Sequence, residues 1–153
     1  MHTDWTMIFT VTLGGVLSAS RGAFLDIDDN IVYTAGTAPG AKDKIDLIYD
    51  GTNLWTPTGC ATNTNCPSNF KSILSGSAST SAFYILPANV QPSTKAIDIE
   101  QYAIAANMVN NVVVATKGIY YMQTSENSRA LILIGAKDAA DFYTIELIIG
   151  YSY

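Results

Sequence analysis

The chain has 153 residues, of which 48% are hydrophobic and only 14% are charged, and its formal net charge at pH 7 is −5. This length predicts a single domain, residues 1–153, with a core large enough to be stable without disulfides. Lys42 and Lys44 are the only closely spaced basic residues, so we expect no nucleic-acid binding, which requires a patch that neutralises phosphates.

Small polar residues take the place of the missing charges: 12 Ser, 16 Thr and 10 Asn make up 38 of the 153 residues. Such a surface is typical of secreted β proteins and of subunits of assemblies, because few charges leave little repulsion against association. The mean hydropathy is positive, which indicates apolar surface that a partner covers. We therefore expect self-association or binding to a surface protein.

The first predicted element is a strand over residues 5–13, because apolar and mostly threonine side chains alternate along it. The residues on its apolar face are Trp5, Met7, Phe9 and Val11. A Gly-Gly pair ends this half-buried strand.

The segment 22–51 organises the rest of the chain. Two short apolar runs, 24–27 and 31–33, flank Asp28-Asp29-Asn30, whose side chains favour a left-handed turn, so we predict a β-hairpin. The glycines and proline of 34–44 argue against a long helix. The run 45–49 then predicts a strand buried on both faces and stopped by an Asp-Gly turn.

Asp46 lies inside that last apolar run. One interpretation places it at a strand edge, exposed to solvent. The other buries it with hydrogen-bond partners, since an unpaired buried charge is too costly to keep.

Three patterns in the first third of the chain carry a resemblance: Gly22-x-Phe24-Leu25-Asp26, Val32-Tyr33-Thr34 and Ile45-Asp46-Leu47-x-Tyr49. Over residues 5–51 the chain is similar to a group of uncharacterised cell-surface and lipoprotein-type domains from Bacteroidetes, with looser agreement at 10–14 and in the final segment. The chain departs from the group at 34–44, where Pro39 and Gly40 replace a more helical linker. The resemblance implies an extracellular or cell-surface location and a strand-rich fold, and it implies no catalytic residue.

Residues 52–69 predict a long surface loop, which is unusual unless it is functional or cross-linked. Trp55 has two interpretations there: an exposed ligand-binding ring that stacks on a sugar or enters a partner's pocket, or a lid folded over the edge of the core. Cys60 and Cys66 have five residues between them, and we predict a local disulfide, which requires an oxidising compartment. The alternative, a metal site, is weak because two thiols alone bind zinc poorly and the only histidine, His2, is far away in sequence.

The middle of the chain mixes short elements. Residues 68–74 predict one or two turns of helix, 75–81 a Gly/Ser-rich linker, and 82–86 a short strand. Residues 97–110 carry an apolar stripe at helical spacing, which favours a helix, although the start of this segment fits a strand equally well.

The C-terminal third predicts strands at 112–116, 119–123, 130–134 and 142–151, the last three joined by short loops as an antiparallel meander. The whole pattern predicts a mainly β fold, an antiparallel β-sandwich or sheet with one or two short helices. The alternative class is α+β.

Catalytic chemistry has little support in the sequence, and we expect no enzyme. Nucleophilic triads need a histidine, and the chain has only His2 beside its N-terminus. The glycines form no phosphate-binding loop, and nothing indicates a cleft holding two carboxylates.

Two binding alternatives remain. Asp26, Asp28 and Asp29 could bind calcium through hard oxygen ligands, but their spacing matches no EF-hand loop and turn formation alone accounts for them. The hypothesis of an aromatic platform for sugars loses support because Tyr120 and Tyr121, neighbours on one strand, point to opposite faces.

We therefore expect a non-enzymatic extracellular or cell-surface structural protein that acts through strand edges and loops. The alternative is a carbohydrate-binding or adhesive module that uses Trp55 and the Cys60–Cys66 loop. No signal-peptide pattern and no apolar run long enough to span a bilayer is visible.

Overall fold

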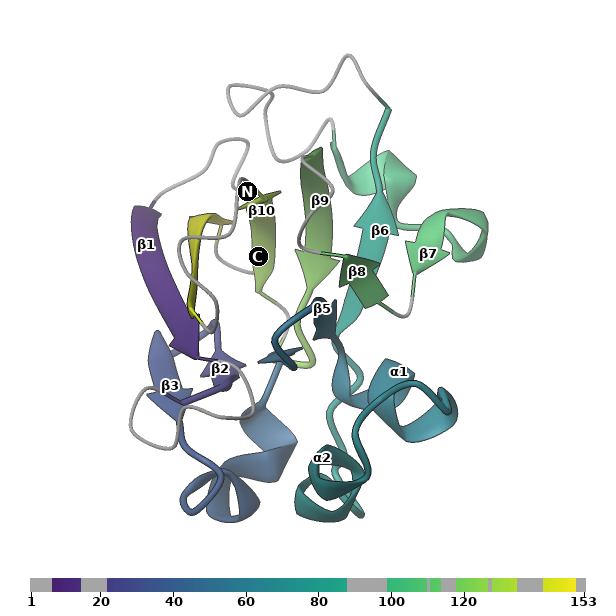
Figure 1. Ribbon diagram of the computed structural model, residues 1–153. Helices are drawn as coiled ribbons and strands as arrows, with labels where there is room; N and C mark the ends of the chain where they lie inside the picture. The colour runs from purple at the N-terminus through teal and green to yellow at the C-terminus, as the bar shows by residue number, and fades with distance from the viewer. Residues whose placement is uncertain are drawn as a thin grey trace.

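A computed structural model describes residues 7–14, 22–87, 99–109, 111–113, 118–126, 128–134 and 142–150. These residues form two antiparallel β-sheets, one above the other in Figure 1, with short helical segments around them. The predicted mainly β sandwich with short helices is confirmed.

The larger sheet has six strands in the order β1-β11-β10-β9-β6-β7. Their bounds are β1 (Met7–Gly14), β6 (Ala82–Ile85), β7 (Met108–Val109), β9 (Gly118–Gln123), β10 (Arg129–Ile134) and β11 (Phe142–Gly150). The predicted meander of β9, β10 and β11 is confirmed. Beyond it, β1 pairs with β11, so that Met7 lies opposite Ile149.

The smaller sheet has five strands in the order β3-β2-β4-β5-β8. Their bounds are β2 (Phe24–Asp26), β3 (Ile31–Tyr33), β4 (Leu47–Tyr49), β5 (Asn53–Trp55) and β8 (Asn111–Val113). The predicted hairpin is the pair β2–β3, and Asn30 in its turn has a left-handed φ of 54°. Of the strand predicted at 112–116, the structure describes residues 112 and 113, which belong to β8 and pair with β5 in this sheet. Residues 114–116 lie outside the described part.

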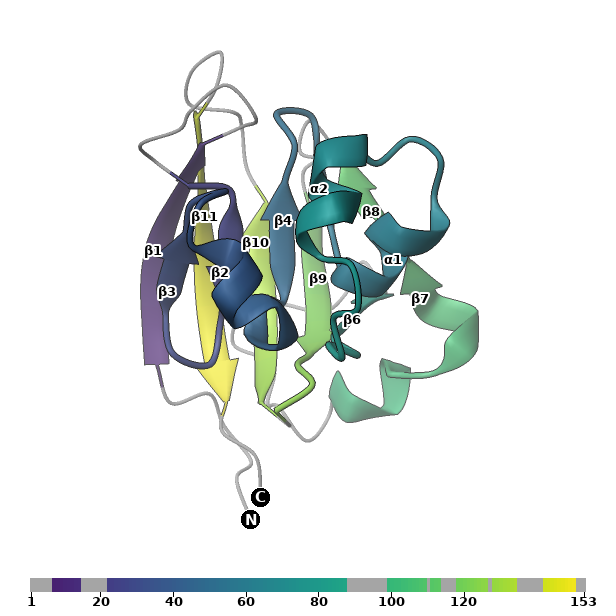
Figure 2. The same cartoon turned by 90° about the horizontal axis from the view of Figure 1, so that it is seen from below.

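Helical segments lie on the outer side of each sheet. They are η1 (Ala38–Lys44), α1 (Pro57–Thr62), α2 (Ser68–Ile73), η2 (Glu100–Tyr102) and η3 (Ala105–Asn107). Figure 2 shows α1 and α2 in front of the five-stranded sheet. The predicted helix at 68–74 is confirmed as α2.

Two predictions of secondary structure are wrong. The supposed loop 52–69 contains β5, α1 and the first two residues of α2. Helix α1 forms because Pro57 occupies its first turn and the Thr56 hydroxyl caps it, accepting the Gly59 amide at 3.0 Å.

The predicted helix at 97–110 is not continuous over its described residues, 99–109. The chain forms two 3₁₀ turns, η2 and η3, with an extended backbone at Ile104 between them. It then pairs with β6 as β7. Residues 97, 98 and 110 lie outside the described part.

Three apolar clusters divide the interior. The cluster between the sheets takes residues from both: Val11, Leu13, Leu25, Ile27, Leu47, Tyr49, Leu54, Phe83, Met122, Ala130, Ile132 and Ile134. A second cluster packs the outer face of the five-stranded sheet against η1, α1 and α2, and it includes Trp55, Phe70 and both cysteines. A third covers the outer face of the six-stranded sheet with Ile99 and its neighbours.

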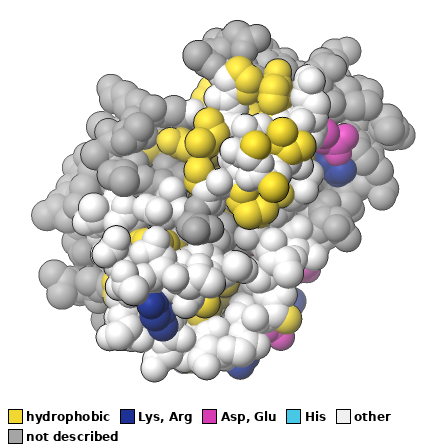
Figure 3. Space-filling model, turned by 90° about the vertical axis from the view of Figure 1, so that its right-hand side faces the viewer, with side chains coloured by type: hydrophobic (Ala, Val, Ile, Leu, Met, Phe, Trp, Pro, Cys, Tyr) yellow, Lys and Arg dark blue, Asp and Glu magenta, His cyan; other side chains and the backbone are white. Residues whose placement is uncertain are grey.

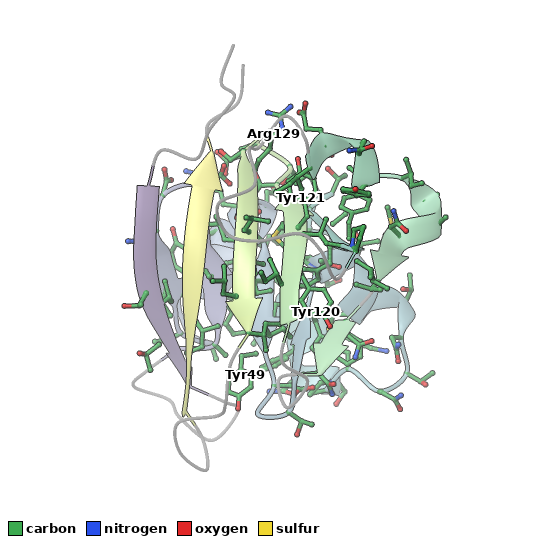
Figure 4. All side chains as sticks on the ribbon, turned by 90° about the horizontal axis from the view of Figure 1, so that it is seen from above. Tyr49, Tyr120, Tyr121 and Arg129 are labelled. Carbon is green, nitrogen blue, oxygen red and sulfur yellow. A yellow bond between two sulfur atoms is a disulfide. The ribbon has the colours of Figure 1, made fainter. Side chains whose placement is uncertain are left out.

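Tyr120 and Tyr121 lie on opposite faces of β9, as the sequence predicts. Tyr121 is buried in the outer cluster, 6.1 Å from the ring of Tyr84, whereas Tyr120 packs against the core between the sheets. Arg129, the first residue of β10, forms an ion pair with Glu100 that holds η2 over the face that carries Tyr121 (Figure 4).

The predicted linker 75–81 is an ordered strap along residues 42–46. The Ser77 hydroxyl donates to the Lys42 carbonyl at 2.7 Å, and the Ser79 hydroxyl donates to the Ile45 carbonyl at 2.7 Å. Hydrogen bonds from serine side chains, rather than a backbone ladder, therefore attach the strap to residues 42–46. They bring Ser81 beside Asp46.

Candidate functional site

Three carboxylates meet where the five-stranded sheet joins the end of β9. Asp26 ends β2, Asp28 lies in the following turn, and Asp46 immediately precedes β4. Antiparallel pairing of β2 with β4 brings these positions together across 20 residues of sequence. One oxygen from each carboxylate lies within 4.8 Å of the others. We call these three residues the Asp cluster.

Asp46 is fully buried and has partners for both oxygens. The Ser81 hydroxyl donates to its Oδ1 at 2.5 Å, and the Ile27 amide donates to its Oδ2 at 2.8 Å. The hydrogen-bonded interpretation of Asp46 is confirmed, and the solvent-exposed one is wrong because β2 and the strap 75–81 cover this strand end.

Asp26 and Asp28 each have one oxygen bonded and one without a partner. The Asp29 amide donates to Asp26 Oδ1 at 3.2 Å, and the Thr124 hydroxyl donates to Asp28 Oδ1 at 3.0 Å. The Oδ2 atoms of both residues are buried with no hydrogen-bond partner. The cluster is therefore rich in acceptors and short of donors.

Burial dominates the electrostatics of the cluster. Desolvation raises the pKa of Asp46 from 3.8 to about 8, although the hydrogen bonds from Ser81 and Ile27 act in the opposite direction. Desolvation also raises the pKa of Asp26 to about 6, and the neighbouring carboxylates add to the rise. Three negative charges so close together need either protons or a cation.

The geometry brings together two of the three residues that the sequence suggests for calcium. Asp26 and Asp28 belong to the cluster, but Asp29 does not: its side chain is half exposed and lies 3.7 Å from the Lys44 ammonium. The third carboxylate of the cluster is that of Asp46. The sequence singles out Asp46 as a candidate buried carboxylate, but only the pairing of β2 with β4 shows which residues it meets.

Trp55 does not lie on the surface. The ring is 1% exposed within the cluster beneath α1 and α2, and its indole N–H donates to Asp50 Oδ2 at 2.8 Å. Asp50 Oδ1 also accepts the amides of Thr52 and Asn53. The predicted ligand-binding ring is thus corrected to a core residue, because a sugar cannot stack on a covered face.

The disulfide between Cys60 and Cys66 is present, and both residues are buried. It links α1, which contains Cys60, to the segment just before α2, which contains Cys66. A hollow of about 400 Å³ opens between these helices, lined mainly by small and hydroxyl side chains together with Lys71. No aromatic ring lines it, so it does not replace Trp55 as a sugar platform.

Among the described residues, no helix combines the length and apolar character that crossing a bilayer requires. Comparisons with models of protein families, with curated proteins and with solved structures found no match to this chain.

Proposed function

We propose that the protein is a non-enzymatic structural module of an extracellular or cell-surface assembly, and that it self-associates through the edge of its six-stranded sheet. The carrying observation is an exposed apolar surface at that edge. Its large residues are Ile104 and Met108, which are 53% and 48% exposed. We call these two residues the β7 patch.

The β7 patch lies beside a strand edge. Within the described residues, β7 is the last strand of the six-stranded sheet and has β6 as its only partner. Figure 3 faces this side of the molecule and shows hydrophobic side chains gathered on it. An apolar surface next to unpaired backbone groups supports strand-edge association, because a partner can bury the side chains and extend the hydrogen-bond ladder.

Composition and cross-linking support the location. The low content of charged side chains leaves little repulsion against association, and a disulfide is typical of proteins from oxidising compartments. The single histidine in the sequence supports a role in contact rather than in proton transfer.

Sedimentation velocity over a wide range of protein concentration tests this proposal. We expect the wild-type protein to form oligomers as concentration rises. Met108→Asp, combined with Ile104→Asp, should shift the distribution to monomers, because a buried unpaired carboxylate in the interface is costly.

Ile31→Asp is the matched control. Ile31 is also exposed, at 41%, but it lies on β3 in the other sheet. Its substitution should leave oligomer formation unchanged. A wild-type protein that stays monomeric at every concentration would contradict self-association. If Ile31→Asp disrupts the oligomers as much as the Ile104→Asp/Met108→Asp variant does, the β7 patch is not the interface.

A further inference from the structure

The Asp cluster contains polar atoms that the protein itself leaves unsatisfied. Asp26 Oδ2 and Asp28 Oδ2 are buried without a hydrogen-bond partner, and Asp26 is fully inaccessible to solvent. In folded proteins almost all buried polar atoms have a partner, since an unmade bond costs on the order of 1–3 kcal/mol. Two such atoms in one cluster indicate a missing ligand.

A third unsatisfied oxygen lies next to the cluster. The Ser125 hydroxyl oxygen is buried without a partner, and the Ser125 amide donates to Ser81 Oγ, the same atom that donates to Asp46. The loop after β9 thus contacts the cluster at two points, through Ser81 beside Asp46 and through Thr124 on Asp28.

No cationic side chain in the described part of the chain forms an ion pair with Asp26, Asp28 or Asp46. Lys44, the nearest in sequence, pairs with Asp29 instead. The negative charge of the cluster therefore has no counter-charge from the described residues.

We propose that Asp26, Asp28 and Asp46 bind a divalent cation of the calcium class. The donors are all oxygens, and neither thiol nor imidazole lies among them, which favours a hard cation over zinc. Calcium accepts irregular sets of carboxylate, carbonyl and water oxygens, whereas magnesium demands a near-ideal octahedron. The site is independent of the proposed self-association.

The bound ion would fasten three parts of the fold at one point. Asp26 and Asp28 belong to the first hairpin, and Asp46 belongs to the segment that enters β4. Through Ser81 and Thr124 the cluster also contacts the six-stranded sheet. The cation is thus a structural ligand that stabilises the folded state by binding it alone.

Thermal unfolding of the full chain in EGTA, in CaCl₂ and in MgCl₂ tests the proposal. At a calcium concentration about tenfold above the dissociation constant, linkage predicts a rise in Tm of roughly 3–6 °C for a chain of this length. Magnesium should produce a smaller rise. No shift with either ion would overturn the site and leave a buried water or shared proton as the partner of the free oxygens.

Asp28→Asn and Asp29→Asn form a matched pair in the same turn with the same change of charge. Asp28→Asn should reduce the calcium shift but raise Tm in EGTA, because it removes a negative charge that repels Asp26. A purely structural role for Asp28 predicts a loss of Tm in both solutions. Asp29→Asn should keep the full calcium shift, since Asp29 lies outside the cluster. Equal loss of the shift in both variants would overturn the assignment.

Discussion

Asp46 is held in a state that its residue type does not favour. It sits fully buried among apolar strands, and its oxygens take bonds from Ser81 and Ile27. These two bonds do not fully replace hydration, since its pKa is still raised to about 8. Burial of this carboxyl therefore favours its neutral form in the cation-free protein.

Stability in EGTA should fall as pH rises from about 5 to about 8. The folded-state pKa of Asp46 is about 8 and that of Asp26 about 6, both above their value of 3.8 in water. The folded state therefore binds more protons than the unfolded state in this window, and the stability present at low pH is lost as pH rises through the folded pKa values. Urea unfolding midpoints at a series of pH values measure the effect.

Asp46→Asn provides the check on that pH dependence. The amide does not titrate, so the loss of stability between about pH 6 and pH 8 should flatten in this variant. The loss of stability due to Asp26, below about pH 6, should remain. Midpoints that increase with pH in wild-type protein would contradict the raised pKa values.

Ser81 is the second residue whose role depends on burial. Its hydroxyl is 2% exposed and donates to Asp46 Oδ1. Ser81→Ala should lower the free energy of unfolding by about 1–3 kcal/mol, because it leaves a buried acceptor unsatisfied. Thr80→Ala, its exposed neighbour, should change stability by no more than about 0.5 kcal/mol in the same urea titration. Equal effects would show that Asp46 does not depend on this bond.

At the scale of elements, the disulfide compensates for two helices that are too short to be stable alone. Helices α1 and α2 have six residues each, well below the length at which an isolated helix persists. Their stability comes from packing on the five-stranded sheet and from the link between Cys60 and Cys66.

Replacing both cysteines by alanine should lower the free energy of unfolding by about 2 kcal/mol, the chain-entropy value for so short a loop. The sulfur atoms also belong to the buried cluster around Trp55, so lost packing adds to the effect. Urea titrations of wild type and variant give the difference, and far-UV circular dichroism should show that the sheets remain. An unchanged midpoint would mean that helix packing alone holds this segment.

At the scale of the whole molecule, the two sheets share one core. Leu25 from the five-stranded sheet and Ile132 from the six-stranded sheet are both fully buried in the cluster between them. Neither sheet can keep its inner face covered without the other, so the described sheets should unfold together.

Leu25→Ala and Ile132→Ala should each lower the free energy of unfolding by about 2–5 kcal/mol through the cavity they leave. Both should move the same single transition, observed by tryptophan fluorescence and by circular dichroism. Two separate transitions in either variant would contradict a shared core.

Local patterns in the sequence were sufficient to predict most strands. Alternation along residues 5–13 and the turn ending at Asn30 are encoded within a few residues. Helix α1 was missed because its stability depends on a capping threonine and a distant sheet rather than on an apolar stripe. Nor could local signals place β8 in the smaller sheet or Asp46 beside Asp26, because strand pairing decides both.

The pairing of β1 with β11 has a consequence for biosynthesis. β1 has β11 as its sole neighbour in the described sheet, and the two are about 130 residues apart in sequence. While the ribosome is still translating the region between them, Val11 and Leu13 have no strand to lie against. During synthesis, β1 must therefore stay out of aggregates until β11 has been made, because only then can the two strands pair.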